Sequence, residues 1–150
     1  MEFSDVIKNR YSCKKFSSEQ IGKDKLDAIL EAGRVAPTAK NLQEQHIYVV
    51  QSESALETID KLTPCRYNAP TVLIVAYNKN NVFTYLGDKR NSGIEDATIV
   101  ATHLMLAAYN EGVDSCWINF FNPDELAKAF NLPEDEEILM LLDIGVADKT

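Results

Sequence analysis

Apolar residues recur along the chain with two spacings, one typical of helices and the other of strands. A period near 3.6 residues predicts helices at residues 5–9, 23–35, 55–62 and 94–111. Apolar and β-branched runs predict strands at residues 46–51, 71–77, 115–118 and 138–146. Ser4 and Ser54 are expected to cap the first and third helices. Asn122 and Pro123 begin a further helix that extends to about residue 130.

The order of these elements indicates the fold class. Helices alternate with strands as α-α-β-α-β-α-β-α-β, and the strands are mostly apolar on both faces, so a central sheet should be covered on both sides. The segment 94–111 is apolar on most sides, which places it centrally or at a subunit interface. Residues 78–92 are polar and rich in turn-forming pairs, which predicts a loop. We expect one domain spanning residues 1–150.

Composition narrows the classes of function. A chain of 150 residues with 45% hydrophobic residues can bury a substantial core. The net charge of −8 argues against nonspecific nucleic-acid binding, which depends on Lys and Arg. The longest apolar stretch is too short to cross a membrane, and the N-terminus lacks a secretory pattern, so we expect a cytoplasmic protein. Cys13, Cys65 and Cys116 lack metal-type spacing and are interpreted as free thiols.

Three short segments contain candidate chemistry. Arg10, Ser12 and Lys14 alternate, so in an extended segment they project to one side and form either a phosphate cradle or a solvated basic turn. Residues 36–43, Ala-Pro-Thr-Ala-Lys-Asn-Leu-Gln, suit either a hydrogen-bonding loop or an ordinary helix-to-strand connection. Residues 112–120 combine a tight turn, a short strand and aromatic bulk, which also fits a core strand.

In their order and separation, these segments resemble the FMN-dependent nitroreductase family. Residues 10–16, Arg-x-Ser-x-Lys-x-Phe, look like the family's Arg-x-Ser-x-Arg-x-Phe opening, and residues 36–43 resemble its Ala-Pro-Ser-x-x-Asn-x-Gln loop. Residues 96–118 are similar to its central helix and following strand, and residues 143–146 to its Ile-Gly-Tyr-like turn. The resemblance spans nearly the whole chain. It implies an α+β fold with three α/β/α layers, a central mixed sheet and a homodimer.

The resemblance also implies a cofactor-binding role for each matching residue. The phosphate and ribityl chain of FMN would be held by Arg10, Ser12 and Lys14. The loop that reaches the flavin from the second subunit would contribute Pro37, Thr38, Ala39 and Asn41. The isoalloxazine ring would be lined by Ile118 and Asn119, with a backbone N–H near Asn119 donating to flavin N5, and Arg66 would place positive charge near N1 and O2.

The implied activity is the transfer of hydride from NADH or NADPH, through FMN, to a small acceptor such as a nitroaromatic or a quinone, in a ping-pong reaction. No catalytic side chain and no metal is expected, because the cofactor performs the chemistry and the protein orients it. Two alternatives stay open. One is a flavin-binding protein with little turnover, and the other is a different flavin reaction on the same fold, such as dehalogenation or flavin breakdown.

The chain departs from the family pattern at several places. Lys14 replaces the commoner arginine and loses its bidentate fork. Gln43-Glu44-Gln45 replaces Gln-Pro-Trp, which removes an aromatic group and adds a charge near the interface, and Phe120 stands where some relatives have a small residue. The sequence ends at Thr150, whereas relatives usually continue into a further phosphate contact and arms that embrace the partner. Weaker FMN retention or a smaller dimer interface is the expected consequence.

Overall fold

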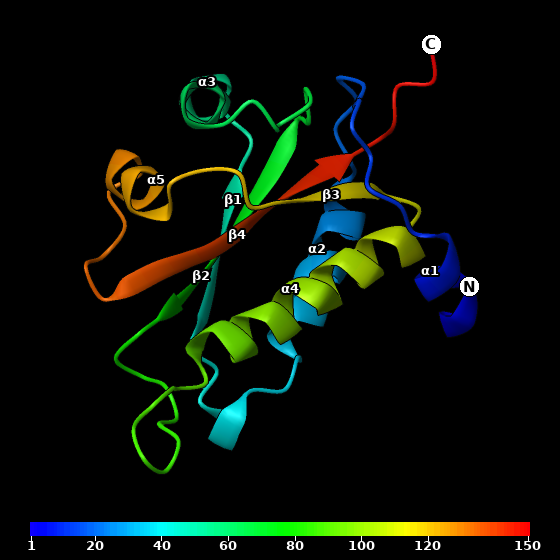
Figure 1. The fold of residues 1–150 in the computed structure, drawn as a ribbon. Coiled ribbons are helices and arrows are strands. Elements are labelled where there is room, and N and C mark those ends of the chain that lie inside the picture. Colours follow the sequence, from blue (N-terminus) through cyan, green and yellow to red (C-terminus); the bar gives the residue numbers. More distant parts are fainter.

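A four-stranded sheet forms the centre of the computed structural model, which describes residues 1–150 (Figure 1). The strands are β1 (Gln45–Val50), β2 (Thr71–Asn78), β3 (Asp114–Ile118) and β4 (Glu136–Gly145), in the spatial order β1-β2-β4-β3. Neighbouring strands pair antiparallel throughout, whereas we expected a mixed sheet. The only parallel pairing is an isolated bridge between Ser12 and Ser115, outside the strand ladder.

Helices cover both faces of the sheet and produce the expected three layers (Figure 1). On one face lie α2 (Lys23–Arg34) and α4 (Gly93–Asn110), and on the other lie α3 (Glu53–Leu62) and α5 (Pro123–Ala129). The short α1 (Phe3–Asn9) lies beside the C-terminal end of α4. A short 3-10 turn, η1 (Ala39–Asn41), precedes β1. The predicted order of helices and strands is confirmed.

The two central strands explain why the core has two halves. Successive side chains of a strand point to opposite faces. Leu73 and Val75 of β2 therefore join the core under α2 and α4, while Val72 and Ile74 join the core under α3 and α5. Every residue of β2 except Asn78 is buried. The continuous apolar run in the sequence thus has a direct cause, because this strand is covered on both faces.

Close packing of α2 on α4 depends on a glycine. A Cβ added to Gly33 would lie 2.7 Å from Leu104 Cδ2, closer than side chains tolerate. The opposite face of α4 is partly open, and Ile94 at its start is 63% exposed. None of the helices combines the length and apolar character that a bilayer crossing requires.

Two of the expected helix caps differ from the structure. Ser4 lies inside α1 and caps nothing, because that helix begins at Phe3. The cap of α3 is Ser52, whose side chain accepts a hydrogen bond from the Ala55 backbone N–H at 3.3 Å, and not Ser54. Since β1 already ends at Val50, the chain turns into the helix two residues earlier than predicted. Asn122 caps α5 as expected and accepts from two backbone N–H groups.

We expect Ser52→Ala to lower the free energy of unfolding by about 0.5–1 kcal/mol, because the first turn of α3 loses a side-chain acceptor. Ser54→Ala is the matched control and should change stability by less than about 0.5 kcal/mol, since its side chain makes no cap. Urea unfolding of both variants measures the difference. A larger loss in Ser54→Ala would contradict the assignment of the cap.

Candidate functional site

An open pocket at the edge strand β3 brings two of the three candidate segments together. Ser12 and Lys14 line it from the N-terminal segment, and Ile118 and Asn119 line it from the end of β3. The pocket has a volume of about 280 Å³, and its remaining lining residues are Cys65, Tyr67, Cys116, Trp117 and Phe120. The N-terminal motif and the third segment, which are separated by a hundred positions in the sequence, therefore share one site.

Backbone hydrogen bonds explain why Ser12 and Lys14 face this pocket. The N–H of Cys13 donates to the carbonyl of Ser115 in β3 at 2.8 Å, which holds the segment against the sheet edge. Cys13 points into the core and is only 3% exposed, so its two neighbours must point outward. The predicted alternation is confirmed for Ser12 and Lys14.

Arg10 lies at the start of the same segment but is not among the residues lining the pocket. Its side chain is partly buried, and its Nε atom has no hydrogen-bond partner within the chain. A buried guanidinium donor without a partner requires water or an anion to satisfy it. Arg10 is thus available to an anionic ligand.

The predicted flavin loop lies outside this pocket, at the start of α4. The backbone N–H of Ala39 donates to Asp96 Oδ1 in the first turn of α4 at 2.9 Å, which fixes the loop to the start of that helix. Strand β3 begins just after the opposite end of α4 and runs along the sheet to Ile118, which lines the pocket. The pocket of the same chain is lined by none of Pro37, Thr38, Ala39 and Asn41.

The loop itself has an unusual backbone. Lys40, Asn41 and Gln43 all have positive φ angles, of 53°, 54° and 52°. The N–H of Gln43 donates to Thr38 Oγ1 at 2.9 Å and closes the turn. Pro37 and Asn41 are exposed, so the turn presents polar groups outward from the fold. The segment is therefore a loop with a defined conformation, fixed by its own hydrogen bond, and not a simple connection between helix and strand.

Arg66 does not line the pocket. Its guanidinium forms two hydrogen bonds with the Asp60 carboxylate, both at 2.7 Å, and a third with the carbonyl of Ala69, also at 2.7 Å. These bonds fix the turn that precedes β2. The structure therefore shows Arg66 stabilising a turn and does not place it with Ser12 and Lys14.

A buried carboxyl group near the pocket was not identified as functional from the sequence. Asp143 of β4 is 1% exposed, and neither of its oxygens has a hydrogen-bond partner. It pairs in the β-ladder with Cys116, which lines the pocket. Burial raises the pKa of Asp143 to about 9, although the nearby Arg66 charge acts in the opposite direction. The sequence did contain one indication of this buried group, because Asp143 is the single charged residue in the apolar run 138–146.

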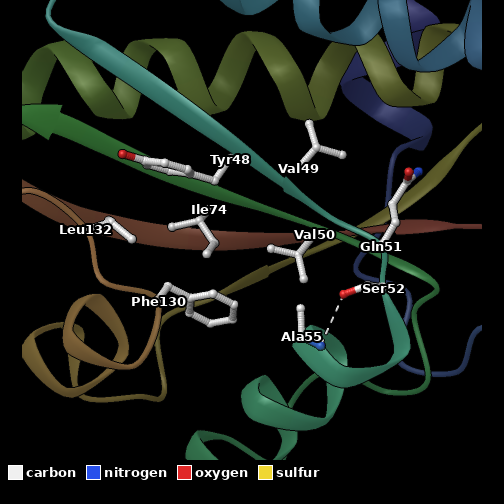
Figure 2. Close-up of a pocket in the computed structure, with 9 residues that line it drawn as sticks. All are labelled: Tyr48, Val49, Val50, Gln51, Ser52, Ala55, Ile74, Phe130 and Leu132. Carbon is white, nitrogen blue, oxygen red and sulfur yellow. Dashed lines mark hydrogen bonds between the residues drawn. The ribbon is translucent and has the colours of Figure 1, made fainter.

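A second cavity, of about 340 Å³, lies between β1, the start of α3 and the end of α5 (Figure 2). Val50, Ile74 and Phe130 point toward one another across it. Its hydroxyl groups are already bonded, since Tyr48 donates to Glu136 and Ser52 accepts from Ala55. The cavity has no cationic lining residue, so it lacks the groups that a phosphate-bearing cofactor requires.

Comparison with known proteins identifies relatives over the whole length of the chain. The nitroreductase family model matches residues 7–66 and 63–146. A crystal structure of a nitroreductase family protein from Clostridium difficile 630 is 33% identical, with a TM-score of 0.95, over 100% of this chain and 87% of that chain. An FMN-dependent nitroreductase from Clostridium difficile R20291 is 25% identical, with a TM-score of 0.85, over 98% and 88% of the two chains. The Bacillus subtilis protein named NAD(P)H nitroreductase YodC is 29% identical, over 97% of this chain and 89% of the relative.

We expect Asp143→Asn to stabilise the protein by about 1–3 kcal/mol at pH 7, because the carboxyl group must keep a proton that the unfolded chain would release. The folded pKa near 9 lies above the usual value of 3.8, so the contribution of Asp143 to stability is most favourable in acid and falls as the pH rises between these two values. Urea unfolding between pH 5 and 8.5 measures the difference. The exposed Asp88→Asn is the control, and parallel pH profiles for wild type and Asp143→Asn would contradict the assignment.

Proposed function

The chain belongs to the nitroreductase family, and on this premise we propose that it is an FMN oxidoreductase that uses NADH or NADPH and works as a homodimer. The observation that carries the proposal is the pocket in which Ser12 and Lys14 meet Ile118 and Asn119. The pocket combines a phosphate-binding residue pair with an apolar wall. Relatives named as FMN-dependent and as NAD(P)H nitroreductases support the choice of cofactor and electron donor.

The cationic side of the pocket fits a phosphate group. Lys14 is exposed beside the Ser12 hydroxyl, and the Nε donor of Arg10 has no partner. Lys15, in contrast, faces Asp148 at 3.8 Å and donates to the Thr150 carbonyl at 3.2 Å. In a chain with a net charge of −8, the free cations of this segment provide a local site for an anion.

The end of β3 fits a flat aromatic ring. Ile118 and Trp117 offer apolar surface, and Trp117 Nε1 donates to Asn119 Oδ1 at 3.1 Å, which fixes the Asn119 side chain. The backbone N–H of Asn119 donates no hydrogen bond within the chain and is free for a ring nitrogen. When bound, FMN would supply hydride and electron transfer between NAD(P)H and the acceptor. The chain would orient the ring, hold its phosphate and donate a hydrogen bond to it.

The separation of the two halves of the predicted site within one chain supports the homodimer. The loop with Thr38 and Asn41 is held at the start of α4, and none of its residues lines the pocket that contains Lys14. The two segments are apart in one chain, and a second copy would place its loop over the first chain's pocket. Exposed apolar side chains on α1 and α4, such as Phe3 (68%) and Ile94 (63%), offer a surface for such pairing.

We propose a small, flat acceptor, such as a nitroaromatic or a quinone. The pocket is open, and Phe120 at its rim is 72% exposed, so an aromatic acceptor could stack against this ring. All three cysteines are free, which suits a reducing cytoplasm. Anaerobic reduction assays with NADH and NADPH against a panel of acceptors test this part of the proposal.

We expect Arg10→Ala to weaken FMN binding by roughly tenfold to a hundredfold, because hydrogen bonds from a charged donor contribute about 1.5–3 kcal/mol. Flavin fluorescence quenching during titration measures the affinity. Lys8→Ala, which removes an exposed cation from α1, is the control and should bind normally. If wild type quenches no FMN fluorescence, the proposed function is wrong. Unchanged affinity in Arg10→Ala would remove only this residue from the site.

A complementation experiment tests whether the site is built from two chains. Arg10→Ala and Asn41→Ala are expected to bind FMN poorly as separate homodimers. When the two variants are mixed, each mixed dimer should contain one site with both defects and one intact site. FMN binding should therefore recover to about half the wild-type stoichiometry in the mixed dimer. No recovery, with mixed dimers confirmed by mass, would show that each site lies within one chain.

A further inference from the structure

Two buried carboxyl groups, Glu44 and Asp96, adjoin the predicted flavin loop at the start of β1 and the start of α4. Glu44, directly before β1, is 5% exposed, and Asp96, in the first turn of α4, is 3% exposed. Both oxygens of Glu44 and Oδ2 of Asp96 lack a conventional hydrogen-bond partner. The fourth oxygen, Asp96 Oδ1, accepts from the Ala39 backbone N–H. The sequence suggested that Glu44 adds a charge near the interface, but the structure buries it.

The two groups lie within hydrogen-bonding reach of each other, and no cation neutralises them. Among the groups on β2 and the 79–92 loop, Tyr77 has its pKa raised by burial and in part by the charge of Glu44, and Tyr85 has its pKa raised by its hydrogen bond to Glu95 and in part by the charge of Asp96. Tyr77 donates to Glu137 of β4, and Tyr85 donates to Glu95. The guanidinium of Arg90 lies over the Tyr85 ring, at 4.3 Å.

Two adjacent buried carboxyl groups without a counter-ion cannot both be ionised, because the low-dielectric interior strengthens their repulsion. One proton shared between them removes the repulsion and supplies a donor for an otherwise unpaired oxygen. Burial and the neighbouring Asp96 raise the pKa of Glu44 to about 7, in agreement with this arrangement.

The pair connects both ends of the loop to α4. Asp96 holds the Ala39 N–H, and Glu44 follows directly after Gln43, the last residue with a positive φ. The Glu44 carbonyl also accepts from the Asn78 N–H at 3.0 Å, so its backbone is fixed to the sheet while its side chain faces α4. A change in the contact between the two carboxyl groups therefore acts on the loop.

We propose that Glu44 and Asp96 share one proton and that this proton positions residues 37–43 for the cofactor site of the partner chain. The link to the cofactor rests on the proposed function. The proton bonds one carboxyl group to the other and, when it leaves, passes to solvent. The two carboxylates then repel, and Glu44 separates from the start of α4. Both are positioning residues, because neither lines the pocket at β3.

The direction of the pH effect follows from the sign of the pKa shift. The folded pKa of Glu44, near 7, lies above its usual value of 4.5, so the bonded arrangement is present in acid and is lost as the pH rises through 7. The loop should therefore be held at pH 6 and loosened at pH 8.5. FMN affinity should fall over the same interval.

The first test is a carbon NMR titration of the side-chain carboxyl groups in the full chain without FMN. We expect the Glu44 carboxyl to titrate near pH 7 and the Ala39 amide signal to shift with the same midpoint. In Glu44→Gln the Ala39 step should disappear, while the exposed control Glu57→Gln should keep it. A Glu44 midpoint near its ordinary value, or an Ala39 amide that does not follow Glu44, would overturn the proposal.

The second test measures FMN affinity by fluorescence quenching at pH 6 and at pH 8.5. Wild type should weaken by about threefold to thirtyfold over this interval, and Glu44→Gln by less than about twofold. FMN titrates identically in both experiments, so the difference isolates Glu44. Identical pH profiles would overturn the positioning role. If no variant binds FMN at any pH, the proposed function fails, and the NMR titration alone decides whether the proton is shared.

A second variant guards against a folding defect. Asp96→Asn keeps an oxygen that can accept from the Ala39 N–H and removes the same shared proton. Thermal unfolding shows whether Glu44→Gln and Asp96→Asn are folded. Both should give the same flat pH dependence of FMN affinity, and a steep dependence in a folded Asp96→Asn protein would contradict the proposal.

Discussion

The site depends on the hydrogen bond by which the Cys13 N–H binds the Ser115 carbonyl at the edge of the sheet. Because this bond fixes the segment in an extended form against the sheet, successive side chains point alternately into the core and out of it. Cys13 and Phe16 enter the core, and Ser12 and Lys14 remain outside over the end of β3. Further backbone bonds, from Phe16 to Tyr67 and from Ser17 to Val146, continue the attachment along the same segment. Without this attachment, the basic residues would form an ordinary solvated turn.

Features encoded locally were predicted well from the sequence. The run at residues 71–77 specified a strand covered on both faces, and Asn122 with Pro123 specified the start of α5. The choice of Ser54 over Ser52 as the cap of α3 was wrong, because the end of β1, and not the serine itself, decides where the helix begins. That Ser12 and the end of β3 share one site was implied only by the family resemblance, since contacts between distant segments leave little trace in local periodicity.

Features that depend on burial in the folded chain could not be predicted from the sequence. Arg66 has suitable chemistry for a flavin, but Asp60 and the Ala69 carbonyl occupy its donors. Glu44 and Asp143 resemble ordinary acidic residues in the sequence, yet both are buried without conventional partners. Burying a carboxyl group in this way costs far more free energy when it is ionised than when it keeps a proton. The chain therefore holds protons at two places that its strongly acidic composition does not suggest.

The separation of the loop from the pocket within one chain would link cofactor occupancy to protein abundance. If a complete site needs two chains, a cell that contains little of this protein holds a larger share of it as incomplete monomers, by mass action. Free FMN would in turn draw monomers together, because it binds the pair and not the single chain. Synthesis of the polypeptide and supply of the vitamin-derived cofactor would then jointly set the amount of working enzyme.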